Sequence, residues 1–253
     1  MNFELRIFQD LESLSREAAR IFSKQAAKAM EERGRFLTAL NGGGTPQRLF
    51  RLLGEEFREE IAWDRIHIFW GDERCVPPGE PGSNYGQAQE AFLDHVPIPD
   101  ANIHRVKGEQ EPAEAARDYA LTLSRFATAP LDFPRFDLVY LGLGEDGHTA
   151  SLFPGSSVDV TEPVIPVTAQ YQDRPADRVT LTPLVINQAR MVVFMAAGEQ
   201  KAITLAEVLS GRYNPEHYPA QRIEPKDGRL IWLVDEDAAG KLPWDMKRRF
   251  CEG

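Results

Sequence analysis

The sequence predicts an α/β protein whose core is a mainly parallel, twisted sheet flanked by helices, a Rossmann-like arrangement. Short apolar segments recur near residues 36, 66, 136, 191 and 230, and helical patterns separate most of them. Glycine-rich turns directly follow several of these segments, as in folds that build sites at strand ends. No internal repeat, low-complexity tract or linker divides the 253 residues. We therefore expect a single domain, 1–253, with a small antiparallel excursion between Ser156 and Leu181.

The first half of the chain alternates between short apolar segments and amphipathic ones. The first helix shows this best, because its apolar residues recur every three or four positions and Asp10 and Gly34 fit its two ends. The expected elements are an edge strand at Phe3–Phe8, helix 11–33, strand Phe36–Leu40, a helix from Pro46 to about Glu60, strand Arg65–Trp70, a helix over roughly Tyr85–Leu93, a short strand Ile103–Val106 and helix Glu111–Ala127.

The second half has shorter and less regular segments. Proline breaks residues 213–225, which we expect at the surface. The expected elements are a buried strand at Phe136–Leu141, short strands at Pro163–Val167 and Arg178–Leu181, a helical turn at Thr182–Gln188, a continuous apolar strand at Met191–Ala196, a helix from Gly198 to about Leu209 and a last strand at Leu230–Val234.

Charge and cysteine content exclude several classes of protein. With 39 acidic and 29 basic residues the net charge is −10, and only Lys247–Arg249 forms a basic run, so neither nucleic acid nor a membrane surface is an expected partner. Cys75 and Cys251 are far apart and form no C-x-x-C motif, which favours a reducing compartment. The N-terminus has no signal pattern, and the longest apolar run, Met191–Ala197, is too short to span a bilayer. We expect a cytoplasmic protein.

A glycine turn at residues 41–46 (NGGGTP) joins a strand to a helix. Thr45 suits the N-cap and Pro46 the first helical position, so free backbone N–H groups of Gly43 and Gly44 would lie near the positive end of the helix dipole. The turn matches neither the dinucleotide fingerprint nor the P-loop, and such turns are often purely structural. It predicts a site for a single phosphate rather than a nucleotide.

Charged residues also follow the next strand, at Asp72-Glu73-Arg74. One interpretation is a solvated loop. The functional interpretation gives Arg74 an oxyanion or a phosphate, because a guanidinium matches the geometry of such oxygens. The neighbouring carboxylates, including Asp72, would then orient the arginine or contact the substrate. The position directly after a strand favours the functional interpretation.

A third turn, Asp146-Gly147-His148, follows the strand at Phe136–Leu141 and precedes what we expect to be a helix start. An Asp-Gly turn with a histidine that lines the helix is the structural alternative. Histidine is, however, the natural general base near neutral pH, and an acid two residues away could orient it. Arg178 and Lys201 are placed where a basic side chain could reach the same edge of the sheet, although each could be a simple surface charge.

Several catalytic motifs do not occur. The sequence has no G-x-S-x-G elbow, which argues against a Ser-His-Asp hydrolase, and we assign Ser151 to the expected helix start. The five histidines form no H-x-x-x-H pair and the cysteines form no cluster, so no metal site is expected.

Three segments together resemble the 6-phosphogluconolactonase family, and their order along the chain makes the resemblance specific. They are LNGGGTP at 40–46, FWGDERCVP at 69–77 with Ser83-Asn84 after it, and LGLGEDGHTASLFPG at 141–155. Residues 178–190, 198–201 and 232–239 resemble the family as well, so the match covers nearly the whole chain. Asn41 departs from the small residue that is more usual there, which affects only the fine geometry of the phosphate loop.

The resemblance implies hydrolysis of 6-phospho-D-glucono-1,5-lactone to 6-phosphogluconate in the oxidative pentose phosphate pathway, with no cofactor or obligatory metal. It implies a fold shared with glucosamine-6-phosphate deaminases. Catalytic roles are implied for His148 as the base, Asp146 as its partner and Arg74 as the oxyanion or phosphate ligand. Substrate binding is assigned to Gly43, Gly44, Thr45, Asp72, Arg178 and Lys201. The expected partner is a small sugar-phosphate lactone, and monomer and homodimer both remain open.

Two rival functions remain at this stage. A glucosamine-6-phosphate deaminase/isomerase shares the glycine loop and the Asp-Gly-His turn, but that family continues toward Asn-Glu-Pro, where this chain has Ser151-Leu152-Phe153-Pro154. It also carries a tyrosine where Arg74 stands. A non-catalytic sugar-phosphate sensor would have no need for the pair Asp146 and His148. Release of ammonia would favour the first rival, and binding without turnover the second.

Overall fold

Seven strands form the central sheet of the computed structural model, which describes residues 3–127 and 129–246. In spatial order they are β1 (Glu4–Phe8), β10 (Arg229–Asp235), β9 (Met191–Ala196), β6 (Leu138–Gly142), β2 (Phe36–Leu40), β3 (Ile66–Trp70) and β5 (Ile103–His104). All neighbouring strands pair in parallel, which confirms the predicted sheet and the edge position of β1. All seven carboxyl ends therefore lie at one edge. The basic run Lys247–Arg249 and Cys251 lie outside the described residues.

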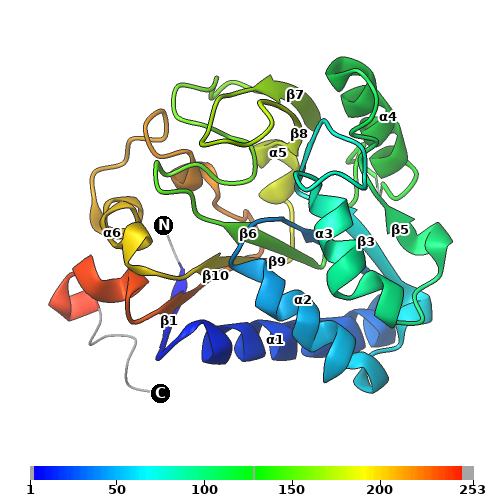
Figure 1. Cartoon of the computed structure of the whole chain (residues 1–253), viewed down its shortest axis with the longest axis horizontal. Helices are drawn as coiled ribbons and strands as arrows, with labels where there is room; N and C mark the ends of the chain where they lie inside the picture. The colour runs from blue at the N-terminus through cyan, green and yellow to red at the C-terminus, as the bar shows by residue number, and fades with distance from the viewer. Residues whose placement is uncertain (1–2, 128, 247–253) are drawn as a thin grey trace.

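Helices cover both faces of this sheet (Figure 1). One face carries α1 (Leu11–Arg33), α2 (Pro46–Glu55) and α3 (Asn84–Ala91), and the other carries α4 (Pro112–Ser124), α5 (Pro183–Ile186) and α6 (Ala202–Ser210). Single 3-10 turns occur at residues 58–60, 63–65, 93–95, 100–102, 199–201, 219–222 and 238–241. Successive strand residues contribute to the two cores alternately, as Phe36 and Leu37 of β2 do. Among the described residues no helix is both long and apolar enough to cross a membrane.

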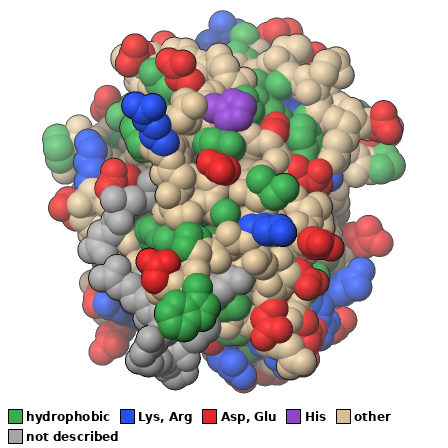
Figure 2. All heavy atoms as spheres, turned by 90° about the vertical axis from the view of Figure 1, so that its left-hand side faces the viewer, with side chains coloured by type: hydrophobic (Ala, Val, Ile, Leu, Met, Phe, Trp, Pro, Cys, Tyr) green, Lys and Arg blue, Asp and Glu red, His purple; other side chains and the backbone are tan. Residues whose placement is uncertain are grey.

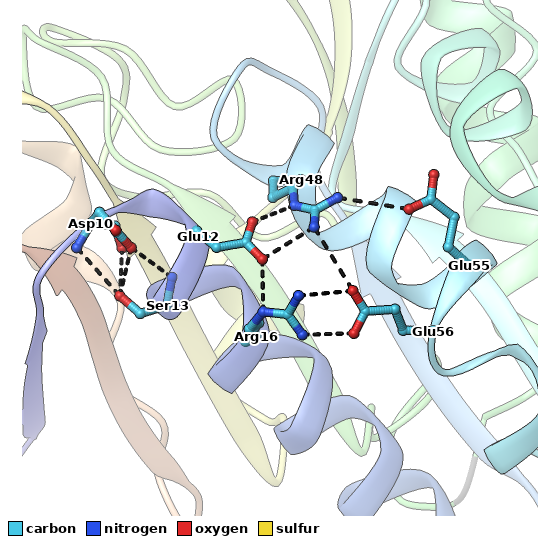
Figure 3. Close-up of polar contacts among 7 residues, drawn as sticks. All are labelled: Asp10, Glu12, Ser13, Arg16, Arg48, Glu55 and Glu56. Atoms are coloured by element: carbon cyan, nitrogen blue, oxygen red, sulfur yellow. Dashed lines mark hydrogen bonds and ion pairs between the residues drawn. The ribbon is translucent and has the colours of Figure 1, made fainter.

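The ends of α1 match the prediction. The Asp10 carboxylate accepts from the backbone N–H of Ser13 at 2.8 Å, and Gly34 ends the helix in the left-handed region at φ 76°. Figure 3 shows how Glu12 and Arg16 of α1 continue into ion pairs with α2: the Arg16 guanidinium binds Glu56 at 2.6 and 2.8 Å. These pairs tie α2 to α1. The amino end of α2 is the glycine loop, so they also fix the base of that loop.

A second, antiparallel sheet confirms the predicted excursion and corrects one boundary. It consists of β7 (Val164–Thr168), β8 (Asp177–Leu181) and β4 (Asp72–Arg74). We expected Asp72–Arg74 in a loop, but these residues are a strand paired with β8, and all three are buried. A run of three charged residues carries no apolar alternation, so only the tertiary pairing reveals the strand.

Three further expectations were wrong. No helix begins after His148; residues 149–155 form turns with an isolated bridge between Thr149 and Leu152. The second helix ends at Glu55 instead of near residue 60. The surface position expected for 213–225 is correct for 213–217, which are largely exposed, but wrong for 219–223, which are buried. Ile223 enters the core, and the Gln221 amide donates to the carbonyl of Glu207 and accepts from the N–H of Asn214. Such an inward polar segment has no periodic sequence signal.

Candidate functional site

A pocket of about 470 Å³ opens at the carboxyl edge of the sheet. Three turns that follow strands β2, β6 and β9 line it, together with β4, β8 and the β7–β8 turn. Eight of the nine predicted site residues line it, namely Gly43, Gly44, Thr45, Asp72, Arg74, His148, Arg178 and Lys201. The ninth, Asp146, contacts the pocket through His148. The structure thus brings together residues that are up to 158 positions apart (201 − 43).

His148 and Asp146 form a hydrogen-bonded pair. Asp146 Oδ1 lies 2.6 Å from His148 Nδ1 and also accepts from the His148 backbone N–H at 3.1 Å. Burial by itself would raise the pKa of the Asp146 carboxyl, but the hydrogen bond and the charge of His148 outweigh it, and the pKa is lowered. An ionised Asp146 accepts a hydrogen bond from the Nδ1–H of the imidazole, and in the neutral tautomer that carries this proton Nε2 is the acceptor.

Two glycines make this pair possible. A Cβ on Gly144 would lie 2.1 Å from His148 Nδ1, so any side chain there would displace the imidazole. Gly147 has φ +88°, and a Cβ would meet the Tyr218 ring at 2.6 Å. The Gly147 carbonyl accepts from the N–H of Ala220 at 3.0 Å, so the buried segment 219–223 fixes the turn from behind.

Aromatic rings hold the imidazole from two sides. The ring centroids of Phe153 and Tyr171 lie 4.5 and 4.6 Å from that of His148. Tyr171 belongs to the β7–β8 turn, which the sequence did not indicate as part of the site. The side chain of His148 is 13% exposed, which leaves one edge of the ring open to the pocket.

Two arginines face each other across β4 and β8. Arg74 and Arg178 are register partners, and opposite residues of an antiparallel pair point to the same face. Both are buried, at 6% and 2% exposure. Arg74 donates from Nη1 to the carbonyl of Gly82 at 2.7 Å, while Arg178 Nε and Nη2 have no hydrogen-bond partner among the described residues. Burial lowers the pKa of Arg178; Asp72 opposes this effect and Arg74 adds to it.

The carboxylates beside Arg74 do not bind its guanidinium as we expected. Asp72 accepts from the Ser151 hydroxyl at 2.8 Å and from the Asn84 amide at 3.3 Å. Ser151 therefore anchors a strand and does not start a helix. Glu73 points inward and accepts from the backbone N–H groups of Arg74, Asn84 and Tyr85, and burial nevertheless raises its pKa to about 7. Both carboxylates fix β4 to the start of α3.

The glycine loop confirms one prediction and corrects another. Pro46 is the first residue of α2, but Thr45 has helical φ and ψ and its side chain makes no capping hydrogen bond. The Thr45 hydroxyl is thus left for a ligand at the pocket wall. Gly43 has φ +112°, which favours glycine, and Gly42 lies so close to Asn84 that a Cβ would overlap its amide oxygen at 1.8 Å. The backbone of this loop can therefore approach a ligand closely.

Lys201 reaches the pocket from the turn after β9. Both carboxylate oxygens of Asp235 accept from the N–H of Gly198, at 3.0 and 2.9 Å, and so hold this turn. The Lys201 ammonium lies 3.9 Å from Glu145, and its side chain is 14% exposed. Burial lowers its pKa, and the charges of Glu145 and Asp146 only partly oppose this. A desolvated ammonium with one distant partner is suited to bind an anion.

The sequence did not indicate six of the polar pocket residues. Arg174 and Gln172 share the β7–β8 turn with Tyr171, Glu145 and Gln200 are sequence neighbours of Asp146 and Lys201, and Asp235 holds the turn that carries Lys201. Polar and aromatic residues between two predicted strands are the only signal that could have identified the turn. Among the described residues no group of three His, Cys, Asp or Glu side chains is arranged to hold a metal ion.

Comparisons with known proteins place the chain among sugar-phosphate enzymes. A family model described as glucosamine-6-phosphate isomerases/6-phosphogluconolactonase matches residues 9–232. A 6-phosphogluconolactonase of Synechocystis sp. is 42% identical over 85% of this chain and 88% of its own length. One of Aggregatibacter actinomycetemcomitans is 38% identical over 81% of this chain and 86% of its own length.

A solved structure agrees with these relatives. The crystal structure of 6-phosphogluconolactonase from Thermotoga maritima superposes with a TM-score of 0.80 at 28% identity, covering 92% of this chain and 100% of that one.

Proposed function

This chain belongs to the family of glucosamine-6-phosphate isomerases and 6-phosphogluconolactonases, and we propose that the pocket at the carboxyl edge of its sheet hydrolyses a sugar-phosphate lactone, with His148 as the general base. The activity is that of a 6-phosphogluconolactonase, a carboxylic ester hydrolase of the pentose phosphate pathway. It converts 6-phospho-D-glucono-1,5-lactone to 6-phospho-D-gluconate. The observation that carries the mechanism is the pair His148–Asp146 in one pocket with a buried arginine, Arg178, whose Nε and Nη2 have no hydrogen-bond partner among the described residues.

The proposed chemistry begins at His148 Nε2. This atom takes a proton from a water molecule, whose oxygen attacks the lactone carbonyl carbon to form a tetrahedral oxyanion. The bond from that carbon to the ring oxygen then breaks, and the imidazolium returns its proton to the leaving ring oxygen. Asp146 stabilises the transient imidazolium and fixes its orientation. A δ-lactone is an activated ester, so no covalent intermediate and no cofactor are required.

We assign the 6-phosphate to the glycine loop and the cations around it. Gly43, Gly44 and Thr45 offer backbone N–H groups and a free hydroxyl at the start of α2. Arg178 offers two unpartnered nitrogens, and Lys201 a desolvated ammonium. Binding of this remote dianion would position the ester, so its binding energy contributes to the rate.

Arg74 and Asp72 complete the proposed site. Arg74 lies opposite Arg178 and is anchored to Gly82, so its remaining nitrogens could stabilise the oxyanion. Asp72 lies at the pocket wall, where its carboxylate can accept from a sugar hydroxyl while it attracts Arg178. We place the enzyme in the cytoplasm, with the sugar-phosphate lactone as its partner and without nucleic acid.

A coupled assay tests this proposal. The lactone is generated in situ from glucose 6-phosphate and its dehydrogenase, and 6-phosphogluconate dehydrogenase reports the product as NADPH above the spontaneous rate. His148→Ala should lower turnover by about two to four orders of magnitude with a modest change in KM, since it removes a general base. The exposed His95, which lies outside the pocket, gives the matched control His95→Ala, and this variant should keep wild-type turnover.

The same assay separates the alternatives. Near wild-type turnover of His148→Ala would mean that another group is the base. Folded wild-type protein without any acceleration would contradict the lactonase activity itself, and ammonia released from glucosamine 6-phosphate would then identify a deaminase.

A further inference from the structure

A second cavity, of about 550 Å³, lies at the opposite edge of the sheet, where the parallel strands begin. Strands β2, β6 and β9 are neighbours, and the residues directly before them are Arg35, Asp137 and Arg190. Because parallel strands begin at the same edge, these three residues meet there. Arg33 at the end of α1 and Arg135 complete the polar lining. Four arginines thus surround one cavity in a protein whose net charge is −10.

Only part of this positive charge is compensated. Asp137 accepts from Arg33 Nε at 3.0 Å and lies 3.3 Å from Arg190 Nε, with which it makes an ion pair but no aligned hydrogen bond. Arg33 Nη1 also pairs with Glu32. Within the described part of the chain, Arg135 donates to two backbone carbonyls, of Gln188 and Asp227, and pairs with no carboxylate, so it keeps its full charge. Arg35 stacks on the Phe126 ring at 5.4 Å and pairs with no carboxylate among the described residues.

The charges at this cavity are distributed differently from those on the face shown in Figure 2. On the face shown in Figure 2, acidic and basic side chains are interspersed. At the amino edge, by contrast, burial lowers the pKa of Arg190, and the charges of Arg33 and Arg135 lower it further, against the opposing charges of Asp137 and Glu32. Four guanidinium groups held together against their mutual repulsion favour an anion between them.

The other wall of the cavity is apolar. Leu37, Phe126 and Leu131 line it together with the arginines, and Arg35 lies over the Phe126 ring. A small inorganic anion would leave this wall unused, whereas a ring-sized body would cover it. Mixed walls and a volume of this size are typical of sites for small organic ligands, which occupy about 300–1,000 Å³. The two arginines without a carboxylate partner would balance a ligand with two negative charges.

We propose that this amino-edge pocket binds an organic phosphate with at least two negative charges, whose organic part is about the size of one ring. The site is separate from the lactonase pocket and does not depend on the assignment of that pocket. Each guanidinium would hold phosphate oxygens, and Phe126 and Leu131 would contact the body of the ligand.

Titration calorimetry with ADP as the probe tests the proposal. Arg178→Gln serves as the background, because it weakens phosphate binding in the lactonase pocket. Within it, Arg35→Gln and Arg135→Gln should each weaken ADP binding about tenfold, the effect of one lost charge-assisted contact. Neither Arg35 nor Arg135 forms an ion pair with Asp137, so both variants should fold. The exposed Arg58, which pairs only with Glu59, gives the control Arg58→Gln, which should bind like the background protein.

A variant in the opposite direction sharpens the test. Asp137→Asn can still accept from the N–H of Leu37 but removes the negative charge from the cavity, so ADP should bind more tightly. Pyrophosphate should bind more weakly than ADP, and adenosine should not bind. The proposal is overturned by absence of ADP binding at millimolar concentration, by an affinity that Arg35→Gln and Arg135→Gln leave unchanged, or by adenosine binding as tightly as ADP. Lactonase activity should be unaffected by Arg35→Gln and Arg135→Gln alone.

Discussion

The two edges of the central sheet use buried charge in different ways. At the carboxyl edge, Arg74 and Arg178 are buried side by side, and nitrogens of both lack partners among the described residues. At the amino edge, the buried carboxylate of Asp137 is surrounded by Arg33 and Arg190 and accepts from the N–H of Leu37 at 2.9 Å. The first arrangement is a net cost to the empty protein, whereas the second joins three strands and a helix.

The difference indicates that the buried charges at the carboxyl edge serve ligand binding, whereas the Asp137 ion pairs at the amino edge stabilise the fold. A ligand can offset the desolvation free energy of buried cations only at the place where it binds them. Cations without protein partners are therefore retained at binding sites. A carboxylate that receives a backbone N–H and two guanidiniums contributes to the folded state in the absence of any ligand. Substitutions at the two edges should therefore have opposite consequences for stability.

The largest effect on stability is expected at the amino edge. Asp137→Ala leaves the N–H of Leu37 without a partner and the two arginines without a counter-charge, so the free energy of unfolding should fall by about 2 to 3 kcal/mol. Urea unfolding measures this, with the exposed Asp132→Ala as control. Lactonase turnover below the unfolding transition should stay near wild type. Unchanged stability together with lost turnover would contradict the division between the edges.

Arg178→Met tests the carboxyl edge. The substitution removes the proposed phosphate ligand and two buried donors that lack partners among the described residues, so KM should rise about ten- to a hundredfold while the thermal midpoint increases. Arg174→Met is the matched variant, because Arg174 lines the same pocket but is exposed. It should raise KM less and leave the midpoint unchanged. A fall in turnover with constant KM would argue against phosphate binding by Arg178.

A histidine pair makes stability depend on pH. His67 Nδ1 lies 3.1 Å from His104 Nε2, and burial, followed by the nearby His67, lowers the pKa of His104 to about 4. Burial also lowers the pKa of His67. As the pH falls, the two histidines are therefore protonated in the unfolded chain before they are protonated in the folded protein. Their contribution to the free energy of unfolding is complete above about pH 6.5 and is lost as the pH falls toward 4.

Urea unfolding at several pH values between 7.5 and 4.5 measures this loss. His104→Gln keeps a group that can bond to His67 but does not titrate, so its stability should fall less steeply than that of the wild type. The raised pKa of Glu73 acts in the opposite direction, but it is common to both proteins and cancels in the difference. Parallel pH curves for the two proteins would show that the pair is not responsible.

The smallest effect is expected for the exposed ion pairs between α1 and α2 in Figure 3. Arg16→Ala should lower the free energy of unfolding only slightly, because solvent screens both partners, and high salt should remove the difference. Thermal unfolding at two salt concentrations measures it. A loss as large as that of Asp137→Ala would mean that exposed and buried pairs contribute alike.

The sequence predicted helices and strands best where the apolar residues follow a single regular pattern. The 23-residue helix α1, with Asp10 and Gly34 at its ends, and the apolar strand Met191–Ala196 were both predicted within a residue. Strand β4 was missed, because Asp72–Arg74 is three charged residues whose burial depends on pairing with β8. The helix expected after His148 was wrong, because Ser151 is held by Asp72, 79 positions earlier in the chain.

What the sequence by itself determined is which residue types follow the strands: an apolar strand followed by glycines, an acid and a histidine places these groups at a strand end, whichever residues later surround them. What only the tertiary structure decided is which charges form ion pairs. Arg178 and Arg190 look alike in the sequence, each beside a strand, yet one lies opposite Arg74 in the pocket and the other beside Asp137. A side chain's partners depend on strand order and register, and these arise from contacts between distant segments that local patterns do not encode.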